Sequence, residues 1–121
     1  MSKRILIADD NGDALAGLAN LLNEMGHEVA FAAGGAQAAE VAQQFAPDVV
    51  IVDLGTPVVE GLAAARSLRA LPNGYAMLLV ALTGWGQPQH REMTQAARFD
   101  VHLVKPISAD QLDFILSMTQ P

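Results

Sequence analysis

Five short, largely apolar segments alternate along the chain with longer segments of helical periodicity. A strand that is covered on both faces has consecutive apolar residues, so these segments are typical of the buried strands of a parallel sheet. They are residues 5–8, 28–32, 49–52, 77–82 and 101–104, of which the second is the weakest. Helices are expected at 13–25, 36–45, 61–70 and 89–97, with a last one after Ser108.

The alternation of strand and helix predicts an α/β fold, a doubly wound five-stranded parallel sheet flanked by five helices. Right-handed crossovers between parallel strands place helices on both faces of such a sheet. The length of 121 residues suits a single domain over residues 1–121, and an apolar content of 51% excludes the disordered class.

The composition limits the partners that the chain can have. Acidic residues outnumber basic ones by 13 to 7, a net charge of −6, so direct nucleic-acid binding is not expected. The absence of cysteine excludes disulfides, thiolate metal sites and a cysteine nucleophile, and it fits a reducing compartment. The first apolar run stops at Asp9, too early for a signal peptide, and no segment approaches the length of a membrane-spanning helix. A cytoplasmic protein without a membrane partner is therefore expected.

Two positions carry local signals for helix ends. Gly26 follows the first helical segment, where a helix C-terminus favours a residue that tolerates positive φ. Ser108 precedes the last helical segment, and Gln111 stands three residues later, which is the spacing of a capping box. These signals predict where the first helix ends and where the last one begins.

Polar residues stand where the strands end. The first strand ends at Asp9-Asp10, the third at Asp53, the fourth at Thr83 and the fifth at Lys105. The carboxyl ends of parallel strands share one edge of a sheet, where the functional groups of open α/β sheets collect. The spacing therefore brings three carboxylates, a hydroxyl and an ammonium group to one edge.

Three carboxylates at one edge repel one another and need a cation. Oxygen ligands suit Mg²⁺, which also takes phosphate oxygens. The ammonium group of Lys105 and the hydroxyl of Thr83 suit phosphoryl oxygens, and a carboxylate can be the nucleophile that forms an acyl phosphate. The expectation is a magnesium-dependent phosphoryl site.

These residues resemble those of a known family, the receiver domain of two-component response regulators, with its flavodoxin-like, CheY-like fold. The resemblance covers the whole chain. It rests on Asp9-Asp10, on Asp53, on the loop DLGTPVVEG with Pro57 and Gly61, on Thr83-Gly84 and on Lys105-Pro106. Residues 82–106 are especially similar to the receiver modules of hybrid sensor histidine kinases.

The resemblance implies a metal site around the phosphoacceptor. Asp53 would accept the phosphoryl group. Asp10, Asp53 and the backbone carbonyl of Gly55 would bind Mg²⁺ (or Mn²⁺) directly, and Asp9 would act through a metal-bound water.

The resemblance also implies how phosphorylation is read out. Lys105 would pair with the acceptor carboxylate and the phosphoryl group, and Thr83 would turn to hydrogen-bond a phosphoryl oxygen. In the family, this movement is coupled to the face formed by helix four, strand five and helix five, with a switch residue at the position of His102. The charge and acceptors of a phosphoryl group can bias such a two-state surface.

The implied function is that of a phosphoacceptor module in a two-component phosphorelay. It would take its phosphoryl group from the phosphohistidine of a histidine kinase or of a phosphotransfer domain. Such a module promotes its own phosphorylation and dephosphorylation, and it is not a turnover enzyme on an external substrate. The output face often mediates dimers or partner docking in the family, so a homodimer stays open.

Three residues depart from the family pattern. His102 stands where Tyr or Phe is usual, and three interpretations stay open: a partly exposed strand-end histidine without a task, a working switch, or a pH-sensitive one. Thr56 stands where methionine is frequent. Arg98 stands where a glycine commonly closes helix four, which predicts a non-glycine residue in the left-handed conformation.

Alternative functions explain less of the sequence. A degenerate receiver that binds partners without phosphorylation stays open because of these departures. An aspartate-nucleophile phosphatase needs a second acid two residues after the nucleophile, where this chain has Gly55. A flavodoxin-like cofactor module needs a phosphate loop rich in glycine and hydroxyls, where this chain has DDNG at residues 9–12. A zinc site at His90 and His102 lacks a ligand cluster.

Overall fold

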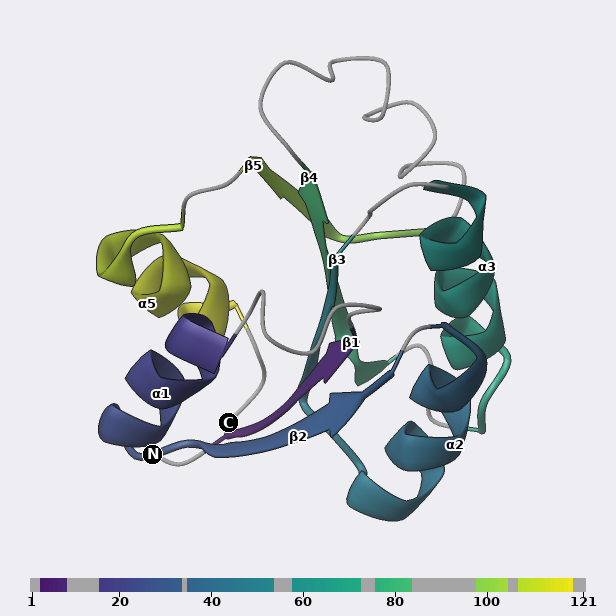
Figure 1. The fold of residues 1–121 in the computed structure, drawn as a ribbon, viewed down its shortest axis with the longest axis horizontal. Coiled ribbons are helices and arrows are strands. Elements are labelled where there is room, and N and C mark those ends of the chain that lie inside the picture. The colour runs from purple at the N-terminus through teal and green to yellow at the C-terminus, as the bar shows by residue number, and fades with distance from the viewer. Residues whose placement is uncertain are drawn as a thin grey trace.

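A central parallel sheet lies between two pairs of helices, one pair on each face (Figure 1). The structure is a computed structural model, and it describes residues 3–8, 16–33, 35–53, 58–72, 76–83, 98–104 and 107–118. The strands are β1 (Arg4–Ala8), β2 (Glu28–Ala32), β3 (Val49–Asp53), β4 (Leu78–Thr83) and β5 (Val101–Val104). The helices are α1 (Ala16–Glu24), α2 (Gly35–Phe45), α3 (Val58–Arg69) and α5 (Ala109–Ser117).

The sheet has the strand order β2-β1-β3-β4-β5, and every neighbouring pair is parallel. This order reverses direction at β1, as a doubly wound sheet requires. The predicted fold class is therefore confirmed, with four helices among the described segments. The fifth expected helix, at 89–97, lies outside the described residues. α3 begins at Val58, three residues before the predicted start at Gly61.

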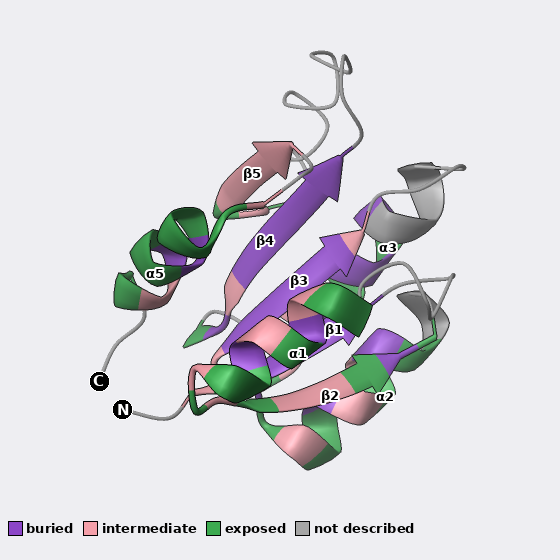
Figure 2. Cartoon of the chain, turned by 60° about the vertical axis from the view of Figure 1, so that its left-hand side comes forward, coloured by how far each residue is buried: buried purple, intermediate pink, exposed green. Residues whose placement is uncertain are grey.

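The core consists of two hydrophobic clusters, one on each face of the sheet. Side chains alternate between the two faces of a strand, so consecutive apolar residues serve both clusters. Leu6 and Val50 pack with α2 and α3, whereas Ile5 and Ile51 pack with α1 and α5. Burial is highest in the central strands and lower in the edge strands β2 and β5 (Figure 2). This explains why the central strands were the clearest in the sequence.

The helix-end signals are confirmed by the backbone. Gly26, the second residue after the end of α1, has a φ of +93°. The Ser108 hydroxyl accepts the Gln111 N–H at 3.1 Å, and the Gln111 side chain accepts the Ser108 N–H at 3.0 Å, which completes the capping box of α5. Ala46 also has a positive φ, of 53°, after α2, and no sequence signal pointed to it. None of the helices within the described ranges is long and apolar enough to cross a membrane.

Candidate functional site

The carboxyl ends of the central strands lie side by side at one edge of the sheet. In the register, Ala8 of β1 pairs with Val52, and Asp53 pairs with Leu82. Thr83, the last residue of β4, pairs with Val104. Among the described residues, the carboxyl ends of β1, β3, β4 and β5 therefore lie at one edge of the sheet, as predicted. Asp9, Asp10, Gly55 and Lys105 lie outside the described residues, and their placement stays a prediction.

Asp53 ends a strand whose other four residues, Val49–Val52, are buried. Its own side chain is half-buried, because the strand reaches the edge of the sheet there. By the alternation along β3, Asp53 belongs to the sheet face that carries Val49 and Ile51, and this face is covered by α1 and α5. Asp53 belongs to neither of the two hydrophobic clusters.

Thr83 is the buried polar residue of the described core, with 1% of its surface exposed. Its Oγ1 lies 2.8 Å from Nε2 of His102 and 3.5 Å from the carbonyl oxygen of Leu103, on the neighbouring strand β5. His102 is partly exposed. Sequence reasoning named both residues but not their contact, which depends on the register between β4 and β5.

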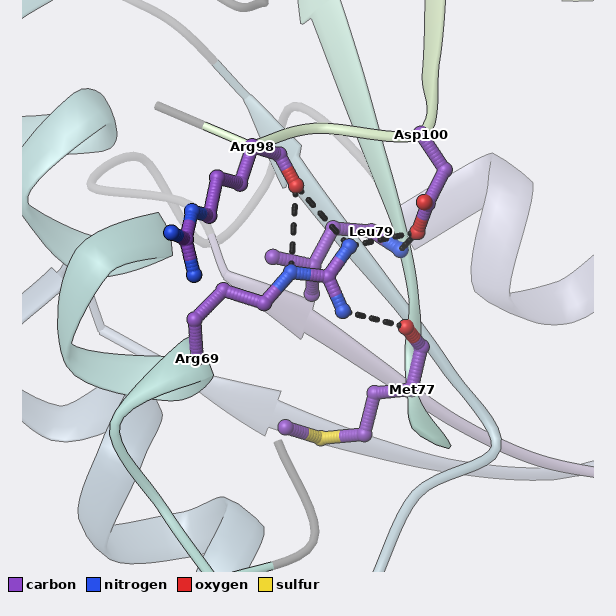
Figure 3. A network of polar contacts seen from close by, with 5 residues as sticks. All are labelled: Arg69, Met77, Leu79, Arg98 and Asp100. Atoms are coloured by element: carbon purple, nitrogen blue, oxygen red, sulfur yellow. Dashed lines mark hydrogen bonds and ion pairs between the residues drawn. The ribbon is translucent and has the colours of Figure 1, made fainter. Parts of the chain in front are cut away.

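A second polar network, around Arg69 at the end of α3, was not anticipated (Figure 3). The guanidinium donates to the Met77 carbonyl at 2.7 Å, to the Arg98 carbonyl at 2.8 and 3.1 Å, and to the Asp100 carboxylate at 2.6 Å. The same carboxylate oxygen accepts the Leu79 N–H at 2.9 Å. The network joins the end of α3 to the residues that directly precede β4 and β5.

The left-handed conformation predicted for Arg98 is confirmed, with a φ of +69°. The carbonyl of Arg98 accepts two bonds from Arg69, so a strained backbone position is attached to the neighbouring helix. The basic residues in the last turn of α3 could have suggested a contact to carbonyl groups. The identity of the Arg98 carbonyl, 29 residues away in the chain, could not be predicted from that signal.

The opposite end of the sheet has its own polar contacts. The Lys3 N–H donates to Nδ1 of His27 at 3.0 Å, just before β2 begins. Burial lowers the pKa of His27, the positive charge of Lys3 lowers it further, and Asp113 opposes the shift. Lys3 and His27 directly precede β1 and β2, so they lie at the opposite end of the strands from Asp53.

An open cavity of about 640 Å³ also lies at that amino-terminal end. Its lining includes Ala46, Pro47 and Met77, with Asp48 as the acidic residue, and the Asp48 carboxylate accepts the Arg4 N–H at 2.9 Å. This cavity therefore does not belong to the edge where Asp53 and Thr83 stand.

A metal ion at the Asp53 edge would need more oxygen ligands than Asp53 alone. The described portion of the chain contains no group of three or more His, Cys, Asp or Glu residues that could bind a metal ion. Asp9 and Asp10, two acidic residues that the sequence assigns to the site, lie outside the described residues. The half-buried carboxylate of Asp53 is an oxygen donor of the kind that Mg²⁺ prefers, so the visible part of the site fits that ion.

Comparison with known proteins identifies relatives over nearly the whole chain. The family model of the response regulator receiver domain matches residues 5–117. The transcriptional regulatory protein PrrA of Mycobacterium tuberculosis is 34% identical over 111 residues, which are 92% of this chain and 47% of PrrA. The sensor protein GacS of Pseudomonas syringae pv. syringae is 35% identical over 112 residues, or 90% of this chain and 12% of GacS. The chain thus spans less than half the length of either relative.

Solved structures show the same fold. The receiver domain of the sensor histidine kinase PA1611 from Pseudomonas aeruginosa, with a magnesium ion coordinated in its active site cleft, has a TM-score of 0.84. It is 30% identical, and the match covers 97% of this chain and 96% of that one. The chemotaxis protein CheY4 of Vibrio cholerae has a TM-score of 0.86 at 26% identity, with 99% and 100% of the two chains covered.

Proposed function

Because the chain belongs to the response regulator receiver domain family, we propose that it is a phosphoacceptor module that receives a phosphoryl group on Asp53. The observation that carries the proposal is the position of this carboxylate. It is half-buried at the carboxyl end of a central strand, with Thr83 at the end of the next strand. The sequence continues from β1 directly into Asp9-Asp10 and from β5 directly into Lys105.

The donor would be the phosphohistidine of a histidine kinase or of a phosphotransfer domain. A carboxylate oxygen of Asp53 would attack the phosphorus in line with the N–P bond, which breaks as the new O–P bond forms and histidine leaves. This would be a change in the domain itself, not turnover of an external substrate. The similarity to the sensor protein GacS, a relative over 90% of this chain, supports a partner of the kinase class.

Asp10, Asp53 and the carbonyl of Gly55 would bind Mg²⁺ or Mn²⁺, with Asp9 acting through a water. When bound, the ion would neutralise charge between the carboxylates and the phosphoryl group. The magnesium ion in the PA1611 receiver domain supports this assignment.

Lys105 and Thr83 would then stabilise the phosphoryl group that Asp53 carries. An ammonium group offsets the negative charge of the phosphoryl oxygens, and a hydroxyl can donate one hydrogen bond to them. The bond made by Thr83 would alter the surface of the 89–97 segment, β5 and α5, with His102 as the switch residue. We place this activity in one cytoplasmic domain over residues 1–121, without direct contact to nucleic acid or membrane and with the switching surface available to a second copy.

The experiment that tests the proposal is intact-mass measurement after incubation with phosphoramidate, with and without Mg²⁺. We expect one phosphoryl adduct in the wild type, dependent on Mg²⁺ and absent from Asp53→Asn. Asp110→Asn, which removes an exposed carboxylate of α5, is the matched control and should form the adduct normally. If no adduct forms and beryllofluoride with Mg²⁺ also fails to bind, the domain is an unphosphorylated binding module and the proposal is wrong.

A further inference from the structure

The hydroxyl of Thr83 is in a setting that constrains its single proton. The residue is 1% exposed, so bulk solvent does not reach its hydroxyl. Two polar atoms of β5 are close to Oγ1: Nε2 of His102 at 2.8 Å and the carbonyl oxygen of Leu103 at 3.5 Å. The first distance is that of a strong hydrogen bond, and the second is at the outer limit.

The two contacts can both be hydrogen bonds in one arrangement only. A carbonyl oxygen accepts, so the hydroxyl has to donate its proton to Leu103. A hydroxyl has no second proton, so it has to accept from His102, and Nε2 then carries a hydrogen. If Nε2 accepted a hydrogen bond instead, the Thr83 hydroxyl would donate its proton to the imidazole. It could then not donate to the Leu103 carbonyl.

We propose that His102 is a positioning residue for Thr83, whose Nε2–H donates to Oγ1 and thereby keeps the hydroxyl proton available for a phosphoryl oxygen on Asp53. The inference rests on the proposed function of Asp53 and deepens it. Phosphoryl oxygens are acceptors only, so Thr83 can bond them only as a donor. The bond given up would be the 3.5 Å contact to Leu103, while the 2.8 Å bond from His102 keeps its polarity.

The burial of β4 and β5 agrees with a contact of Thr83 with the phosphoryl group and a positioning role of His102. β4 is buried from Leu79 to Thr83, whereas all four residues of β5 are half-exposed (Figure 2). His102 thus contacts the site from an edge strand, and Thr83 alone of the two is enclosed in the core. The imidazole acts through the hydroxyl and needs no contact with the reacting atoms.

The first test reads the tautomer directly. Long-range proton–nitrogen NMR on the full chain with ¹⁵N-histidine is recorded at about pH 8, where an ordinary imidazole is neutral. We expect the His102 signals, assigned by their loss in His102→Gln, to show a protonated Nε2, both before and after addition of beryllofluoride and Mg²⁺. An unprotonated Nε2 in the free protein would overturn the proposal. This result does not depend on whether Asp53 is phosphorylated.

The second test asks whether His102 acts through Thr83. Beryllofluoride affinity in the presence of Mg²⁺ should fall about fivefold in His102→Phe, which corresponds to roughly 1 kcal/mol for one lost hydrogen bond. It should stay within about twofold of wild type in His102→Gln, whose amide N–H can still donate. In a Thr83→Val background, the change from histidine to phenylalanine should have no further effect.

The outcomes separate this inference from the proposed function. An equal loss in both backgrounds would show that His102 does not act through the hydroxyl, and it would refute the inference while leaving phosphorylation of Asp53 intact. Absence of the Asp53-dependent adduct would refute the proposed function, and the tautomer measurement would still decide whether His102 is the donor. The unfolding midpoint of each variant verifies that it is folded.

Discussion

The Arg69 network offers a prediction whose magnitude can be worked out from the contacts. Arg69→Met removes the guanidinium and keeps an unbranched apolar side chain that matches the aliphatic part of arginine. The change leaves the carbonyls of Met77 and Arg98 without their charged donor, and the side chain of Arg69 is only 11% exposed. Hydrogen bonds from charged donors contribute about 1.5 kcal/mol or more each.

The ion pair with Asp100 contributes less than these carbonyl contacts. The side chain of Asp100 is 40% exposed, so solvent screens the pair and water can replace the lost partner. We assign less than about 1 kcal/mol to it. The Arg98 carbonyl is exposed and can bond to water instead, so Arg69→Met is expected to lower the free energy of unfolding by about 2 kcal/mol, a substantial part of the total for a domain of this size.

The assay is urea unfolding followed by circular dichroism, with the slope of the transition compared between variants. Arg66→Met is the matched control, because Arg66 is exposed in the same last turn of α3, and it should cost less than about 0.5 kcal/mol. Arg69→Lys should recover only part of the loss, since one ammonium group does not reproduce the planar fork of a guanidinium. The reasoning fails if Arg69→Met costs no more than Arg66→Met.

Three further predictions concern helix ends and pH. Ser108→Ala should cost about 1 kcal/mol through loss of the capping box, measured by the same urea assay, and an unchanged midpoint would contradict it. Ala46→Gly should stabilise by roughly 0.5–1 kcal/mol because Ala46 has a positive φ, whereas Ala63→Gly inside α3 should destabilise by a similar amount; equal signs would refute the argument. The pKa of His27 is lower in the folded state, so its contribution to stability is complete above about pH 6.5 and is lost as the pH falls through the lowered pKa. His27→Asn, which can still accept the Lys3 N–H, should flatten the fall in unfolding free energy between about pH 7 and 5, and an unaltered slope would rule His27 out as its cause.

Much of the fold could be predicted from the sequence because local patterns carry it. The runs at Val49–Asp53 and Val101–Val104 and the capping box of Ser108 depend on residues close together in the chain. The same locality applies to the polar residues that end the strands. Asp53 and Thr83 lie at the sheet edge that the sequence predicted for them. The metal ligands Asp9, Asp10 and Gly55 and the role of Lys105 stay predictions.

Two features of the helix ends were not predicted from the sequence. The start of α3 at Val58 precedes the predicted Gly61, although Val58 stands four residues before Leu62, which is the spacing of one helix face. Ala46 takes a positive φ that its residue type does not favour.

By itself, the sequence determined which segments form strands, which strand ends carry Asp53 and Thr83, and that Arg98 takes the left-handed conformation. Only the tertiary structure decided which of these residues touch. The 2.8 Å bond from His102 to Thr83 depends on the register of two strands, and the bond from Arg69 to the Asp100 carboxylate crosses 31 residues of chain. The Thr83 contact forms because the packed sheet excludes bulk water from the hydroxyl, whereas the Arg69 contact forms because the fold brings the end of α3 beside the residue before β5.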